Sequence, residues 1–293
     1  MLLNKRISVW EFIRQIRVAV IWICAYAVAV GFLDGHHWFA KIVIPLGVTG
    51  VVGTALSLLL AFRTGQSYER WWEARVVWGA IVNDSRTLIR QAQLYLPSVT
   101  TGEVKTFAER QIVWCYALGE ALRRQPHSPR VQEYLKVHGL LEQNMPNALL
   151  SAHSRQLKTL SESEKITEFG LIQMDSTIMR LCDSMGKCER IKNTIFPRNY
   201  SLLIHSLIYV FATMLPFGLD DSYVMVEIMI TAALPIIFIA IEKTAILMQD
   251  PFENLPIDTP MTALATTIEI NILQAIGDKR VPTQQAQDSY YVM

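Results

Sequence analysis

The feature that most constrains this chain is a run of 21 residues, 42–62, that contains no charged side chain. A helix of about 20 apolar residues spans the ~30 Å hydrocarbon core of a bilayer, whereas surface helices of soluble proteins carry a polar face. Further apolar runs occur at residues 18–33, 201–219 and 223–241. The sequence therefore predicts an all-α membrane protein with four membrane helices, and no cleavable signal precedes the first of them.

The composition requires a second, more polar region. Hydrophobic residues make up 51% of the 293 residues and charged residues 18%, against about 25% charged in typical soluble domains. Residues 63–197 are rich in Leu, Arg, Gln, Glu and Ala at helical spacing, which predicts a helical bundle outside the membrane. Within it we expect helices over residues 148–158 and 164–192, the second opened by the acidic segment from Ser161. The net charge of +1 gives no indication of a nucleic-acid partner.

The distribution of basic residues predicts the orientation. The loop after the first run has one cation, Lys41, and the loop between the last two runs has none. Lys and Arg are concentrated in the N-terminal segment, after residue 62 and before residue 198, and loops of this kind face the cytoplasm. We therefore expect both termini in the cytosol and four regions: 1–62 with two membrane helices, 63–197 cytosolic, 198–248 with two membrane helices, and 249–293 a cytosolic segment that wraps the bundle.

Few polar residues interrupt the apolar runs. Pro216 and Pro235 predict kinks in the third and fourth runs. His205 is either a packed, hydrogen-bonded histidine or a pore position, and Glu227 is either an interfacial carboxylate or one that faces protein or water. The chain has no GxSxG, P-loop, HExxH or strand-associated GxGxxG sequence, so we expect no enzyme activity.

The run at residues 42–62 carries two overlapping patterns. Small residues recur every three or four positions, which favours close helix packing. Thr54, Leu58 and Phe62 also recur every four positions, so they share one stripe of a helix. That stripe could face lipid, a neighbouring helix or a narrow lumen, and periodicity does not choose between these.

Charged and aromatic residues follow this run. The helical pattern is expected to break at residues 63–67 and then to resume with Arg70, Trp71, Trp72 and Glu73. Indole rings and cations are typical of the membrane–water interface. We expect these four residues to act in interface anchoring and packing.

Five segments, in this order, resemble the bestrophin family, particularly its bacterial members. They are FRTGQSYERWWEARVVWG (62–79), FPRNY (196–200), LPFGLDD (215–221), QDPFENLPID (249–258) and ALATTIEINIL (263–273). The resemblance covers about residues 5–277 and implies a homopentameric ion channel, with four identical partner subunits around a central pore. It also implies a multi-pass protein of the bacterial cytoplasmic membrane.

In that family the second membrane helix forms a narrow apolar neck through three residues at four-residue spacing. By position these are Thr54, Leu58 and Phe62, where the threonine departs from the aliphatic residue usual in the family. A hydroxyl ring there would wet more easily than an aliphatic one. A cytosolic aperture would fall at His205 or Ser206, which also depart from the family's aliphatic residue.

The family's calcium clasp is an acidic cluster after a DPF sequence. This chain has Asp250, Glu253 and Asp258 there but no dense acidic run, whereas calcium prefers six to eight oxygen ligands. We treat the three residues as a remnant of the clasp and expect neither calcium gating nor a required cofactor.

The permeant ion is the least determined property. Ring edges of Phe62 and the hydroxyl of Thr54 could attract an anion, whereas acidic outer loops would concentrate cations. Those loops contain Asp34, Asp220 and Asp221. We favour passive anion (chloride) conduction, with a cation (sodium) channel of the same fold as the alternative. A secondary transporter or a membrane-anchored structural module are further alternatives.

Overall fold

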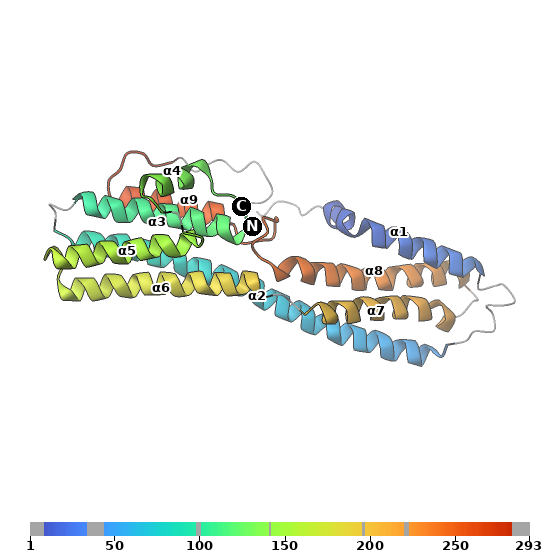
Figure 1. Ribbon diagram of the computed structural model, residues 1–293. Helices are drawn as coiled ribbons and strands as arrows, with labels where there is room; N and C mark the ends of the chain where they lie inside the picture. The colour runs from blue at the N-terminus through green and yellow to red at the C-terminus, as the bar shows by residue number, and fades with distance from the viewer. Residues whose placement is uncertain are drawn as a thin grey trace. The chain divides into compact units, whose positions relative to one another are not determined.

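The computed structural model describes residues 9–33, 44–97, 101–140, 142–194, 197–219 and 223–282. All regular structure within these ranges is helical, as predicted (Figure 1). The helices are α1 (Val9–Leu33), α2 (Leu46–Tyr95), α3 (Thr101–Leu122), α4 (Pro129–Val137), α5 (Met145–Glu162), α6 (Glu168–Asn193), α7 (Arg198–Met214), the 3-10 turn η2 (Pro216–Gly218), α8 (Val224–Gln249) and α9 (Met261–Ala275).

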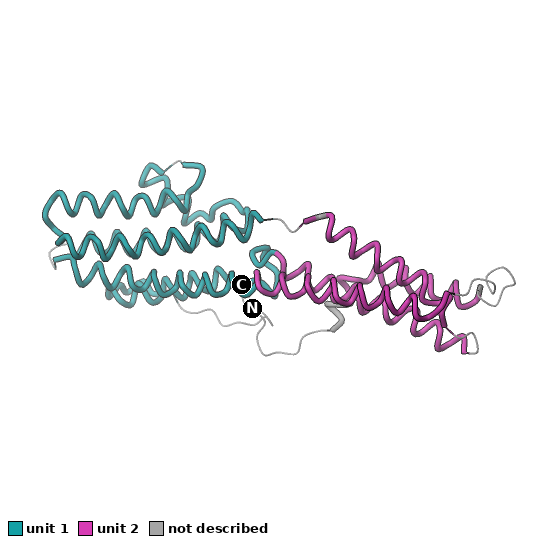
Figure 2. Tube along the Cα trace, turned by 90° about the horizontal axis from the view of Figure 1, so that it is seen from below, with its two compact units in different colours: residues 1–5, 71–194, 250–293 teal, residues 6–70, 195–249 magenta. Residues whose placement is uncertain are grey.

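The chain divides into two compact units, coloured separately in Figure 2. One comprises residues 6–70 and 195–249 and is called the membrane unit below. The other comprises residues 1–5, 71–194 and 250–293 and is called the bundle unit. The division falls between Arg70 and Trp71, further along α2 than the predicted boundary at residue 62.

The membrane unit contains α1, α7, α8 and the first part of α2. By length and composition α1, α2 and α8 are each long and apolar enough to cross a membrane, and α7 is a shorter apolar helix. Each of the four predicted runs thus forms a helix over most of its described residues. In this unit α1 and α7 pack against α8, while Leu56 and Leu60 of α2 form an apolar cluster with α7.

Helix α2 continues without interruption through residues 63–67, so the predicted break there is wrong. Gly65 lowers helix propensity by about 1 kcal/mol relative to alanine, but tertiary packing outweighs that cost. Arg63 and Ser67, one turn apart, are both buried, and the Thr64 hydroxyl donates to the Leu60 carbonyl oxygen at 2.8 Å. Local composition indicated a break because it contained no information about the partner of Arg63.

The two prolines of the apolar runs have different roles. Pro235 lies inside α8, where it is buried, whereas Pro216 begins η2 directly after α7 ends. The kink predicted at Pro216 is therefore a helix end. Proline cannot donate the backbone hydrogen bond that would continue an α-helix, and its fixed φ suits the first position of a new turn.

The bundle unit has the larger apolar core. Trp78 of α2, and Trp114 and Phe107 of α3, are completely buried in it, and α3 packs against both α5 and α9. The expected helix over residues 148–158 lies inside α5. The start of α6 differs from the prediction: it is Glu168, where the Thr167 side chain accepts from the Gly170 N–H, and the segment from Ser161 instead ends α5.

Candidate functional site

One face of the α2 segment in the membrane unit is apolar and uncovered. The side chains of Leu58 and Phe62 are 58% and 59% exposed, and Thr54 is also exposed. The opposite face is buried, with Leu56 and Leu60 at most 1% exposed. The three predicted neck residues therefore share a face that no described residue of this chain covers.

The buried face of α2 explains the small residues only in part. A Cβ atom built on Gly53 would lie 2.9 Å from the ring of Phe211 on α7, so a side chain there would push the two helices apart. Gly47 and Gly50 have no described atom within 4 Å of such a Cβ. Close packing within the chain thus accounts for Gly53 and leaves the Thr54–Leu58–Phe62 face for lipid, a lumen or another subunit.

The hydroxyl of Thr54 is already engaged. Its Oγ1 donates to the carbonyl oxygen of Gly50 at 2.8 Å, one turn back in α2. A hydroxyl has one proton to donate and two lone pairs that accept. In this rotamer Thr54 therefore offers acceptor lone pairs, rather than a donor, to a species that passes the exposed face.

A charged network inside the membrane unit was missed by the sequence reasoning. Arg63 Nη1 lies 2.9 Å from Glu242 Oε1, and both side chains are only 2% exposed. His205 Nδ1 lies 3.0 Å from the same carboxylate oxygen. The network joins α2, α7 and α8, and His205 also approaches the Ser201 carbonyl oxygen at 3.0 Å.

The signal for this network was present but ambiguous. Arg63 directly follows the uncharged run of α2, and Glu242 directly follows the last apolar run, a position that is typical of residues at the polar side of a membrane. Only the fold brings residues 179 positions apart in sequence into contact. Arg63 is adjacent in sequence to the predicted neck residue Phe62, so the network contacts α2 one residue from that position.

The remaining polar residues of the membrane unit differ in burial. His205 and Ser206 are exposed on α7, and His205 also belongs to the network just described. Their role as an aperture stays a prediction. Glu227 on α8 is 3% exposed, which favours the protein-facing alternative over an interfacial position. The acidic outer-loop residues Asp34, Asp220 and Asp221 lie outside the described residues.

The predicted packing motif makes defined contacts within each unit. In the membrane unit, Arg70 Nε donates to the Gln249 carbonyl oxygen at 3.0 Å. In the bundle unit, Trp71 Nε1 donates to the Ile257 carbonyl oxygen at 2.7 Å and Glu73 accepts from Arg190 at 2.6 Å. Trp72 is exposed, with its ring 6.4 Å from that of Trp71. Packing is thus observed for three of the four residues, and interface anchoring stays a prediction.

In the segment after α8, Asp250 and Asp258 accept hydrogen bonds from other residues of the same chain. Asp258 is completely buried, and its Oδ2 accepts from the backbone N–H groups of Glu253 and Leu255 at 2.8 and 3.0 Å. Asp250 accepts from Lys192 at 2.6 Å. Among the described residues no group of three or more acidic, histidine or cysteine side chains has the arrangement of a metal site. The absence of calcium gating stays a prediction.

The burial of Asp258 predicts a pH-dependent stability. Burial raises its pKa from the ordinary value to about 6, although the two backbone donors oppose this. The folded state then binds the proton more tightly than the unfolded state. Its contribution is present below about pH 4 and is lost as the pH rises through about 6, which corresponds to ~3 kcal/mol.

We expect Asp258→Asn, which keeps an oxygen acceptor for both N–H groups, to remove this part of the pH dependence. Thermal unfolding of the purified protein between about pH 7 and about pH 5 measures it. Glu253→Gln is the matched control, because Glu253 is an exposed carboxylate of the same loop. Equal pH profiles for wild type and Asp258→Asn would contradict the assignment.

Similarity to known proteins agrees with this geometry. The family model described as bacterial/fungal bestrophin protein matches residues 6–274. The voltage-dependent anion channel-forming protein YneE of Escherichia coli K12 is 28% identical over 293 residues, covering 98% of this chain and 96% of that protein. The voltage-dependent anion channel-forming protein RSc3414 of Ralstonia nicotianae is 30% identical over 262 residues, covering 87% of this chain and 85% of that protein.

The fold has a counterpart among solved structures. The crystal structure of a bacterial bestrophin homolog from Klebsiella pneumoniae superposes with a TM-score of 0.83 at 24% identity, covering 90% of this chain and 99% of that one. The family model covers nearly the whole chain, and the relatives are named channel-forming proteins rather than enzymes. With its apolar helices, its uncovered α2 face and these similarities, this chain is a membrane protein that belongs to the bacterial and fungal bestrophin family.

Proposed function

We propose that this protein is a homopentameric channel that conducts small monovalent ions passively, with Thr54, Leu58 and Phe62 lining its neck. The observation that carries the proposal is the uncovered apolar face of α2 in a member of a channel family. Five copies arranged with this face toward the axis would enclose a narrow, largely apolar passage. Hydrophobic constrictions of this kind exclude water when narrow and conduct when they widen or wet.

The pattern of covered and uncovered faces of α2 supports this proposed arrangement. The Leu56 and Leu60 face of α2 packs on α7 within one subunit, so it is not available to line a lumen. The Leu58 and Phe62 face is free for that role. The mass of the purified protein tests the assembly, since a pentamer weighs five times the 33.3 kDa of one chain.

Anion conduction is the favoured selectivity. The two relatives reported above are named voltage-dependent anion channel-forming proteins. The ring of Phe62 can also present its positive edge toward an anion. We therefore propose chloride as a permeant ion and the cytoplasmic membrane of a bacterium as the location, with both termini in the cytosol.

A cation-selective channel of the same fold is the second candidate, favoured by one specific observation. Because Thr54 donates its hydroxyl proton to Gly50, a ring of five such hydroxyls would present acceptor lone pairs to the lumen. Acceptor oxygens coordinate cations. The anion-selective and cation-selective channels differ in the sign of the reversal potential in asymmetric NaCl.

The test is the reversal potential of purified protein in planar bilayers with asymmetric NaCl. We expect current down the NaCl gradient. The reversal potential should have the same sign as the equilibrium potential of chloride. The opposite sign would assign the channel to sodium, and a reversal potential that does not follow either gradient would exclude a selective pore. Protein-free bilayers are the control for leak.

A further inference from the structure

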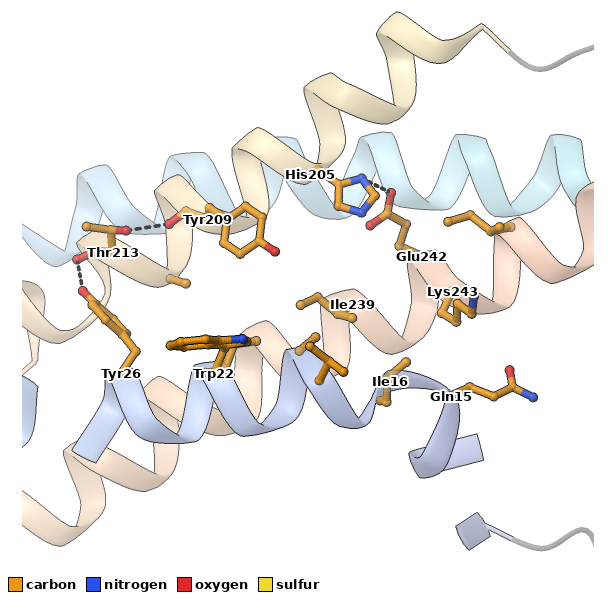
Figure 3. Close-up of a pocket in the computed structure, with 15 residues that line it drawn as sticks. Gln15, Ile16, Trp22, Tyr26, His205, Tyr209, Thr213, Ile239, Glu242 and Lys243 are labelled. Atoms are coloured by element: carbon orange, nitrogen blue, oxygen red, sulfur yellow. Dashed lines mark hydrogen bonds and ion pairs between the residues drawn. The ribbon is translucent and has the colours of Figure 1, made fainter. Parts of the chain in front are cut away.

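A second site lies in the membrane unit, away from the exposed face of α2. It is a groove of about 550 Å³ between α1, α7 and α8 (Figure 3). Small-molecule sites fall in the range of about 300–1,000 Å³, so the groove has the volume of a ligand site. Its lining residues are Gln15, Ile16, Val18, Ala19, Trp22, Ile23, Tyr26, His205, Tyr209, Ala212, Thr213, Ile239, Glu242, Lys243 and Ile246.

One end of the groove is polar and carries a cation that has no ion-pair partner among the described residues. Figure 3 shows Lys243 and Gln15 at this end. Glu242, which also lines the groove, is held by Arg63 and His205 at 2.9 and 3.0 Å. Lys243 forms no hydrogen bond or ion pair with any residue in the described ranges. Its ammonium group is thus available to an anion at the mouth of the groove.

The rest of the groove is mainly apolar, and a hydrogen bond joins two helices at its far end. Ile16, Ile23, Trp22 and Ile239 supply apolar wall along its length. At the end opposite Lys243, the Tyr26 hydroxyl donates to the Thr213 carbonyl oxygen at 3.4 Å and so joins α1 to α7 (Figure 3). The site is therefore amphipathic along its length, with a cation at one end and hydrocarbon beyond it.

We propose that this groove holds one anionic phospholipid of the bilayer, with an acyl chain against α1 and α8 and the phosphate at Lys243. Basic pockets between membrane helices favour anionic headgroups, and each Lys or Arg near the surface contributes about 1 kcal/mol. Trp22 is 72% exposed, so its indole covers the groove from the lipid side without sealing it. The inference depends on the membrane location of the chain and not on which ion it conducts.

Native mass spectrometry of the full-length protein with phosphatidylglycerol or phosphatidylethanolamine added tests the proposal. We expect wild type to retain one phosphatidylglycerol per subunit in preference to phosphatidylethanolamine. Lys243→Gln should reduce retention of phosphatidylglycerol about fivefold, to the level of the zwitterionic lipid. Ala19→Trp, which places an indole in the apolar part of the groove, should abolish retention of both lipids.

Two control variants keep the test specific. Arg17→Gln removes an exposed cation of α1 that does not line the groove, and Val28→Trp places an indole on α1 outside it. Both should retain phosphatidylglycerol as wild type does. Equal loss in Arg17→Gln and Lys243→Gln would mean surface binding only and would overturn the proposal.

Other outcomes would also overturn it. Unchanged retention in Ala19→Trp would show that the lipid lies elsewhere. Absent retention in wild type, together with a changed oligomeric mass in Ala19→Trp, would mean that a second copy of the chain covers the groove. Lys243→Gln alters a partly exposed side chain, so its result stands even if Ala19→Trp fails to fold.

Discussion

Truncating both apolar neck residues, Leu58→Ala with Phe62→Ala, is expected to raise the single-channel current about tenfold, the factor that ~1.4 kcal/mol of barrier represents. Both side chains are more than half exposed on α2, so their removal takes hydrophobic surface from the proposed lumen without opening a cavity in the core. A wider, less apolar constriction stays hydrated for longer. Currents recorded in planar bilayers under symmetric salt measure the effect.

The matched control is a double truncation elsewhere in the membrane unit. Ile237→Ala with Met229→Ala removes comparable apolar side chains that are also exposed, but from α8. We expect its current to equal that of wild type. A similar rise in both double variants would mean that conductance depends on general loosening of the helices, and an unchanged current in the α2 variant would remove these residues from the neck.

Breaking the buried Arg63–Glu242 pair is expected to cause the largest loss of stability. Glu242→Gln removes the negative charge that lies 2.9 Å from Arg63, whose side chain is 2% exposed. Removal of one partner of a buried ion pair costs about 3–5 kcal/mol, because the remaining charge stays buried and loses the compensation of that partner. At about 2–4 °C per kcal/mol for a chain of this size, the Tm of the purified protein should fall by roughly 10 °C.

The double variant separates the cost of an orphaned charge from the value of the pair. Arg63→Met with Glu242→Met replaces both charges by apolar side chains of similar length, so most of the lost stability should return. Glu162→Gln is the control, since Glu162 pairs with Lys158 at an exposed site where ion pairs contribute about 0–1 kcal/mol. A Tm of Glu242→Gln equal to that of wild type would contradict the assignment of a buried, structurally required pair.

The network also links two candidate functional positions. Arg63 directly follows the predicted neck residue Phe62, and His205 is one of the two predicted aperture residues. Arg63 and His205 contact the same oxygen of Glu242. A change at either position therefore acts on the other through a shared carboxylate within one subunit. Local sequence does not specify this link, because Arg63 and Glu242 each follow an apolar run and lie 179 positions apart.

The aromatic and charged segment after residue 62 shows which contacts local hydropathy can predict and which it cannot. Trp71 and Trp72 were predicted to anchor an interface, which is typical of indoles that follow an apolar run. Within the bundle unit the Trp71 N–H donates to the Ile257 carbonyl oxygen, in a loop far along the chain, while interface anchoring stays a prediction. Hydropathy describes a residue's preferred solvent, and it does not identify the backbone acceptor that satisfies a particular donor.

The sequence by itself determined the fold class, the four apolar runs and the stripe of Thr54, Leu58 and Phe62. These depend on helical periodicity and local hydropathy, which are properties of neighbouring residues. Only the tertiary structure decided that α2 continues through residues 63–67, that Arg63 and Glu242 are buried together, and that Gly53 faces Phe211. Such contacts join residues more than 150 positions apart, and their energies depend on burial, which exists only once the helices have packed.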